Sequence, residues 1–254
     1  MLPKTPSLSG AALKYIACIS MLLDHIGASC LEIGIMTHWP NPTGCTTFAA
    51  LAAADPAFAP VYWTDYALRQ VGRLAFPLYC FLLVEGFCHT RSVRRYAGRL
   101  GLFALVSEVP FDLAFFAAGW QPAHQNVYFT LLLGLCALWW LRRYPAGGGF
   151  GGWLRSLAGL AACAAAAEWL RTDYGAAGVV LIALFYLYRS MPMSRSILAA
   201  TVLYATPAAW LALPLTHWYN GRRGRTGPVA ARLFYAFYPA HLLLLAAITF
   251  CLRG

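Results

Sequence analysis

Charged residues are scarce in this sequence. Lys, Arg, Asp and Glu together make up 11% of its 254 residues, against roughly a quarter in an average soluble domain. Hydrophobic residues account for 60% of the chain. A soluble globule could not bury that much apolar surface, whereas a lipid bilayer accepts it in helical segments of about 20 residues. The composition therefore excludes a soluble domain and indicates an integral membrane protein whose first partner is the bilayer.

The chain also lacks the residue pairings that give cysteines and basic residues a special role. Its eight cysteines include no CxxC pair and no His/Cys pair at ligand spacing, so structural thiols are expected and a metal site is not. The net charge of +10 comes from short Lys and Arg clusters that lie between apolar segments. Such clusters orient membrane helices, so nucleic acid is not an expected partner.

Eight apolar segments predict an all-α polytopic transmembrane bundle that forms a single domain over residues 1–254. They are residues 11–36, 67–88, 99–118, 127–141, 153–170, 176–188, 196–218 and 233–252. Thr206-Pro207 and Pro214 interrupt the seventh segment, which favours a hairpin of two short helices over one full span. With each arm counted, the sequence predicts about eight to nine membrane passes.

Basic residues predict the orientation of these segments. Arg91, Arg94 and Arg95 follow the second segment, Arg142 and Arg143 follow the fourth, and the turn at 219–225 is also basic. By the positive-inside rule, these loops and the amino terminus are cytoplasmic. The loops 37–65 and 119–125 contain no Lys or Arg, so we expect them on the outer side.

Five ionisable residues inside the predicted spans are the candidates for chemistry, because each costs about 2.5–3.5 kcal/mol at a helix centre on insertion scales. Asp24, His25 and Glu108 lie at one depth, near the middle of their segments. Glu108 is therefore predicted to orient His25. Arg73 and Asp112 lie at a second, matching depth, which predicts an ion pair. Two alternatives stay open: His25 as a packing residue, and the Arg73–Asp112 pair as a purely structural contact.

Other charged residues lie nearer the predicted inner surface. Glu85 precedes His89 by one helical turn, which favours a surface anchor over a binding role. The basic loops 91–99 and 222–225 are candidate sites for the phosphates of a nucleotide. Ordinary positive-inside charge explains the same two loops equally well.

Several blocks of sequence, in order along nearly the whole chain, resemble the TraX family, whose founding members are the F-pilin acetylases of conjugation systems. The blocks are LKYIACISMLLDHIGA from Leu13, GRLAFPLYCFLLVEGFCHTRSVRRYAGRL from Gly72, FALVSEVPFDLAF from Phe103, QNVYFTLLLGL from Gln125, DYGAAGV from Asp173, YNGRRG from Tyr219 and FYAFYPAHLLLL from Phe234. Residues 37–65 carry little of this resemblance, so substrate preference is expected to depart there.

The resemblance implies a multi-pass protein of the bacterial inner membrane that transfers an acetyl group from acetyl-coenzyme A to the amino terminus of pilin or to a related envelope acceptor. It implies no metal. Carried onto matching positions, the implied catalytic residues are Asp24, His25, Arg73, Glu108 and Asp112. The implied residues for binding substrate or coenzyme A are Glu85, Asn126, Arg222, Arg223 and His241.

Acyl transfer also fits the ionisable residues themselves. An α-amino group with a pKa of about 7.7–8.0 is mostly protonated at neutral pH, so neutral His25 is expected to act as base. Arg73 or Asn126 would stabilise the oxyanion, and no Ser or Cys has an evident His partner for an acyl-enzyme. The alternatives are an acyltransferase for another surface acceptor, a small-molecule or proton-coupled transporter with Asp24, Glu108 and Asp112 as its relay, and a non-enzymatic pilus assembly factor.

Overall fold

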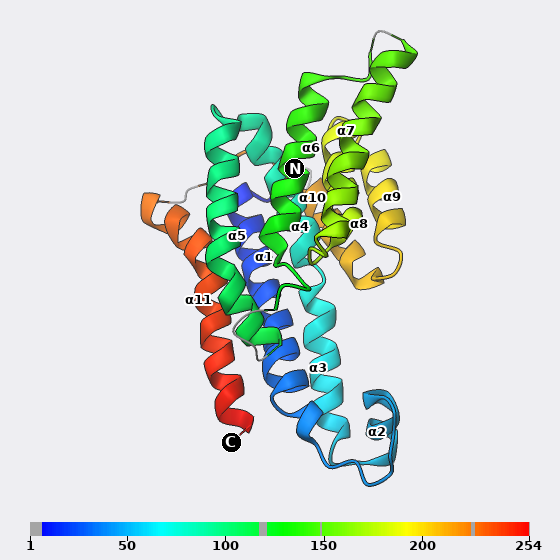
Figure 1. Ribbon diagram of the computed structural model, residues 1–254, viewed down its shortest axis with the longest axis vertical. Coiled ribbons are helices and arrows are strands. Elements are labelled where there is room, and N and C mark those ends of the chain that lie inside the picture. The colour runs from blue at the N-terminus through cyan, green and yellow to red at the C-terminus, as the bar shows by residue number, and fades with distance from the viewer. Residues whose placement is uncertain (1–6, 117–120, 148, 225–226, 254) are drawn as a thin grey trace, which may run out of the picture.

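The computed structural model describes residues 7–116, 121–147, 149–224 and 227–253. Over these ranges the chain is a helical bundle, and its β pairing consists of two isolated bridges (Figure 1). Four helical stretches in the described ranges are long and apolar enough to cross a bilayer, namely Gly10–His38, Ala59–His89, Phe150–Trp169 and Leu233–Arg253. The predicted all-α membrane bundle is thus confirmed, while the count of eight to nine passes stays a prediction.

The first span changes its helical geometry halfway along. Helix α1 (Gly10–His25) begins at Ser9, whose hydroxyl accepts a hydrogen bond from the Ala12 amide at 3.2 Å. It continues without a break into the π-helix η1 (Ile26–Ile33). A π-helix in a membrane span often accompanies a functional site. His25, the last residue of α1, lies at this transition.

The second span is longer than the sequence predicted. Helix α3 (Ala59–Gly72) starts eight residues before the expected boundary at 67, and α4 (Ala75–His89) continues it after a short break at Arg73. Pro60 suits the first turn of α3, where a missing N–H is tolerated. Gly72 allows α3 to approach α1 closely, because a Cβ atom at this position would lie 2.2 Å from the Cβ of Asp24.

The remaining long helices complete the bundle around α1 and α4. Helix α11 (Pro228–Arg253) packs along α5 (Val93–Phe115), while α6 (Val127–Arg143), α7 (Phe150–Trp169) and α8 (Gly175–Leu187) pack against one another (Figure 1). The core that these helices enclose is rich in Phe and Leu. Large apolar side chains also cover the outside of the bundle, including Leu105 and Phe250. Such a surface suits contact with lipid.

Two short helical elements lie in the loop that follows the first span. The 3-10 helix η2 (Met36–His38) and helix α2 (Phe48–Ala54) form a small unit beyond η1, in the predicted outer loop (Figure 1). There the Trp39 indole donates to the Asp55 carboxylate at 2.9 Å. This hydrogen bond lowers the pKa of Asp55.

The seventh predicted segment is broken as expected into α9 (Pro192–Val202), η3 (Pro207–Leu211) and α10 (Ala212–His217). The following turn then joins the start of α1. The Leu8 amide donates to the Trp218 carbonyl, and the Asn220 amide donates to the Leu8 carbonyl, each at 2.9 Å. The basic turn and the beginning of α1 therefore lie at the same end of the bundle, as the hairpin interpretation requires. The side of the membrane that this end faces stays a prediction.

Candidate functional site

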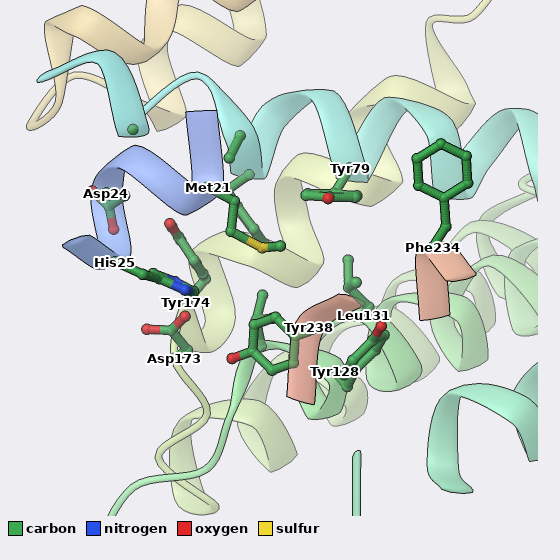
Figure 2. Close-up of a pocket in the computed structure, with 14 residues that line it drawn as sticks. Met21, Asp24, His25, Tyr79, Tyr128, Leu131, Asp173, Tyr174, Phe234 and Tyr238 are labelled. Carbon is green, nitrogen blue, oxygen red and sulfur yellow. The ribbon is translucent and has the colours of Figure 1, made fainter. Parts of the chain in front are cut away.

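A cavity of about 60 Å³ lies in the centre of the bundle, between α1, α4, α6 and α11 and the turn that precedes α8. One end is polar, where Asp24, His25, Asp173, Tyr174 and Tyr238 meet (Figure 2). The rest of the wall is apolar or aromatic. This polar end is the candidate functional site.

His25 is held by a second histidine. Its Nδ1 lies 2.7 Å from Nε2 of His241, and Nδ1 of His241 lies 2.7 Å from the Phe237 carbonyl oxygen. A carbonyl oxygen only accepts, so His241 carries its proton on Nδ1, and its Nε2 must accept from His25. The neutral His25 ring therefore has its proton on Nδ1 and a lone pair on Nε2. This assignment follows from the hydrogen-bond chain.

Aromatic packing fixes the two rings. His25 and His241 are nearly parallel, with ring centroids 5.0 Å apart, and Phe115 contacts the His25 ring edge-on at 5.0 Å. His241 is 5% exposed. Figure 2 shows the His25 ring reaching into the space bounded by Asp173, Tyr174 and Tyr238. The ring is thus held from behind and presented to the cavity in front.

The predicted partner of His25 is wrong. Glu108 instead accepts hydrogen bonds from the side chain and the backbone amide of Asn126. The side-chain amide of Asn126 also donates to the Ala104 carbonyl at 2.8 Å. The side-chain oxygen of Asn126 caps α6 by accepting from the Tyr128 backbone amide at 3.0 Å. These bonds tie α5 to the start of α6. Glu108 and Asn126 are absent from the described residues that line the site cavity.

The predicted ion pair between Arg73 and Asp112 is also wrong. Within the described ranges, ion pairs shorter than 4 Å join Arg69 to Asp24 and Glu32, and Arg189 to Glu85. Asp112 accepts from the Gln121 backbone amide at 2.6 Å. Arg73 follows the last residue of α3, at the break before α4. Arg69 lies one turn before Arg73, on the face of α3 that packs against α1. It forms an ion pair with Asp24, of the kind that the sequence had predicted for Arg73 from its depth in the membrane.

Arg69 links the first two spans beside the cavity. Its guanidinium lies 2.7 Å from Asp24 and 3.1 Å from Glu32, which is in the π-helix. The second carboxylate oxygen of Asp24, Oδ1, is buried and has no hydrogen-bond partner within the described part of the chain. Arg69 therefore occupies one carboxylate oxygen of Asp24, and the other oxygen packs against Gly72 of α3. The sequence offered no signal that singled out Arg69.

Asp173 is the cavity carboxylate that sequence reasoning missed, although the DYGAAGV block began with it. Its amide donates to the Gln125 carbonyl at 2.9 Å, which joins the turn before α8 to the start of α6. The Asp173 side chain is exposed, yet the surrounding protein raises the pKa of Asp173 to about 6. Desolvation is the largest cause, and repulsion by Asp24 adds to it. The charge of Asp173 therefore changes near physiological pH.

Two tyrosines complete the polar end. Tyr174 stacks on Phe76 with its ring plane 3° from parallel, and Tyr238 packs edge-on against Tyr128. Figure 2 shows the hydroxyl groups of Tyr174 and Tyr238 at the same end of the cavity as His25 and Asp173. Phenolic hydroxyl groups can donate to an oxyanion. They therefore offer the function that the sequence had assigned to Arg73 or Asn126.

The remaining predicted residues lie at the other end of the bundle. Glu85 is buried and receives two hydrogen bonds from Arg189, at 2.7 and 3.2 Å. Arg222 and Arg223 are exposed in the turn beside the start of α1. Glu85 and Arg223 both line a second, larger cavity, but neither reaches the site cavity. In the described portion of the chain, no group of three His, Cys, Asp or Glu side chains is arranged to hold a metal ion.

Comparisons with known proteins agree with this architecture. The model of the family described as TraX protein matches residues 9–249. A relative described as "Probable fimbrial assembly protein FimC, serogroup H1", from Dichelobacter nodosus, is 31% identical over 271 residues, which cover 94% of this chain and 95% of the relative. No solved structure matches. The family model spans nearly all of the bundle, including His25, Asp173 and His241, and the chain therefore belongs to the TraX family.

Proposed function

We propose that this protein is a membrane-embedded acetyltransferase. It transfers an acetyl group from acetyl-coenzyme A to a primary amine of a cell-envelope protein, and the amino terminus of a pilin is the first acceptor to test. The observation that carries the proposal is the His25–His241 hydrogen bond. It leaves a basic nitrogen at the site cavity, as a general base for acyl transfer requires.

The reaction needs one proton acceptor and one anion-stabilising donor. In the proposed step the acceptor amine attacks the thioester carbonyl carbon, and His25 Nε2 takes a proton from the attacking nitrogen. The C–S bond then breaks, and the imidazolium returns the proton to the leaving sulfur. The products are an N-acetylated acceptor and free coenzyme A, with no further reactant required.

Other residues of the cavity have supporting roles in this proposal. Tyr174 and Tyr238 are placed to donate to the oxyanion of the tetrahedral intermediate. Ionised Asp173 favours the positive charge that develops on His25. His241 positions the ring and its tautomer without touching the substrate, as a carboxylate does in a serine protease triad.

The family and its relative support an acceptor in the pilus. The Dichelobacter nodosus relative is described as a fimbrial assembly protein, and fimbriae are assembled from pilin subunits. The enzymatic and the non-enzymatic hypotheses therefore both place the protein in pilus biogenesis. The cavity favours the enzymatic one, because a structural assembly factor has no need of a base presented to a polar cavity.

The direct test is acetyl transfer by the purified protein. The protein in lipid nanodiscs is incubated with radiolabelled acetyl-coenzyme A and a peptide copied from the amino terminus of a pilin encoded in the same genome. We expect labelled peptide from the wild type and none from the same peptide with a blocked amino terminus. His25→Ala should be inactive yet monodisperse. Absence of transfer to free-amine peptides, or full activity of His25→Ala, would overturn the proposal.

A further inference from the structure

Three cavities follow one another through the bundle. The site cavity of about 60 Å³ adjoins a middle cavity of about 100 Å³, which adjoins a wide cavity of about 410 Å³ near the start of α1. Consecutive cavities share lining residues: Tyr79, Tyr128, Leu131 and Phe234 for the site and middle cavities, and Lys14, Leu82, Tyr96 and Tyr235 for the middle and wide cavities. The three cavities therefore lie in a row from the end of the bundle to His25, with shared side chains between neighbours, and we call this row the path.

A single face of α1 follows this path. Lys14 lines the wide and middle cavities, Cys18 the middle one, and Met21 and His25 the site cavity. Their spacings of four, three and four residues place all four side chains on one helix face. At about 1.5 Å per residue, Lys14 and His25 are about 16 Å apart along the axis. The path is thus long and narrow, with a wide entrance.

The entrance carries positive charge without internal compensation. Lys14, Arg99 and Arg223 line the wide cavity, whereas its carboxylate, Glu85, is already paired with Arg189. None of the ion pairs found within the described ranges includes these three cations. An entrance of this kind suits an anionic group, and phosphate above all. The amine of Lys14 lies 4.9 Å from the centre of the Phe234 ring, at the neck where the wide cavity narrows.

We infer that the path holds the acyl donor, an inference that rests on the proposed function. The phosphorylated nucleotide of coenzyme A occupies the wide cavity, whose volume lies within the range of about 300–1,000 Å³ usual for ligand pockets. The linear pantetheine arm passes Lys14 and Cys18, because the two inner cavities are too small for a nucleotide. The thioester then reaches His25, and after transfer the free thiol leaves along the same path.

Cys18 provides a probe inside the path that does not depend on activity. Its side chain is 7% exposed, and its Sγ lies 3.0 Å from the Tyr79 hydroxyl. A small methanethiosulfonate reagent is used to label the nanodisc-embedded protein, and modification is read at each cysteine by mass spectrometry. We expect a thioether analogue of acetyl-coenzyme A to slow labelling of Cys18 at least tenfold. Labelling of the exposed Cys88, which lines none of the three cavities, serves as the internal control and should not change.

Variants and competitors test the entrance. Arg99→Ala combined with Arg223→Ala should raise the analogue concentration for half-protection about tenfold or more. The matched control, Arg142→Ala combined with Arg143→Ala, removes two exposed cations that do not line the wide cavity and should leave that concentration unchanged. Adenosine 3′,5′-bisphosphate should compete with the analogue. Competition by phosphatidylglycerol in place of the bisphosphate would assign the entrance to lipid and overturn the inference.

The outcomes separate this inference from the proposed function. Acetyl transfer by a protein whose Cys18 is not protected would overturn the donor path and leave the acetyltransferase proposal intact. Protection of Cys18 in a protein that acetylates no amine would support the path and overturn the acetyltransferase proposal. Equal effects of the two double variants would also overturn the path.

Discussion

Two clusters of ionisable groups lie inside this bundle, and they differ in what their polar atoms face. In the first, His25, Asp24 and Asp173 face a cavity, and their remaining contacts come from behind. In the second, Glu108 and Asn126 join two helices through hydrogen bonds to each other and to the backbone. Both clusters cost free energy to bury. Only the first cluster lines the site cavity, whereas Glu108 Oε1 in the second is buried and has no partner among the described residues, so burial of charge alone does not identify a site.

The largest expected effect separates the two clusters by activity. His25→Ala should lower the rate of acetyl transfer by about 10²–10⁴-fold, the usual loss for a general base. Glu108→Gln should keep the rate within about threefold, since its amide oxygen still accepts from Asn126. Single-turnover rates and size-exclusion profiles of both variants would check this. A larger rate loss in Glu108→Gln than in His25→Ala would reverse the comparison.

The next effect tests the positioning role of His241. His241→Ala should slow transfer by roughly 10²-fold, because His25 loses the acceptor that fixes its tautomer. In His241→Gln, the amide oxygen lies near the former position of Nε2 and can accept from His25. That variant should recover most of the rate. Similar rates for the alanine and glutamine variants would reduce His241 to a packing residue.

A smaller effect should depend on pH. As pH falls through about 6, Asp173 takes up a proton and no longer favours the charged form of His25. The wild-type rate should therefore fall, and Asp173→Asn, which is neutral throughout, should be about tenfold slower at pH 8. The ratio of the two rates should approach one near pH 5. A ratio that stays constant between pH 5 and 8 would exclude Asp173 from catalysis.

The smallest effect concerns stability and belongs to the second cluster. Asn126→Ala removes the cap of α6 and leaves the buried Glu108 carboxylate with only the backbone amide of residue 126 as a donor. We expect a loss of about 1–3 kcal/mol in the free energy of unfolding. The rate per folded molecule should stay within about threefold, since Asn126 does not line the site cavity. Denaturation in mixed detergent, with activity normalised to folded protein, would measure both quantities.

Much of the architecture was predictable because the length of apolar segments and the position of basic clusters can be read directly from the order of residues along the chain. The all-α bundle and the break in the seventh segment follow from position along the chain, and so does the place of His25 inside the first span. Which side chains face one another across the bundle does not follow from position along the chain. Arg73 and Asp112 lie at compatible depths, yet α3 turns Arg69 toward Asp24 instead.

Asp173 shows a second limit. It lies outside every predicted span, so the rule that singles out charges within helices passed over it. Only the pairing of its turn with Gln125 brings this loop residue to the centre of the bundle. A resemblance block marked the position, but spacing along one chain could not assign it a role.

The hydrogen bond between His25 and His241 joins positions that are 216 residues apart. Under the proposed mechanism, a nascent chain that has inserted α1 has its base but lacks the group that sets the tautomer of that base. The two histidines pair only after α11 has been synthesised and has packed against α5. We therefore expect a chain truncated anywhere before residue 241 to transfer acetyl groups no faster than His241→Ala.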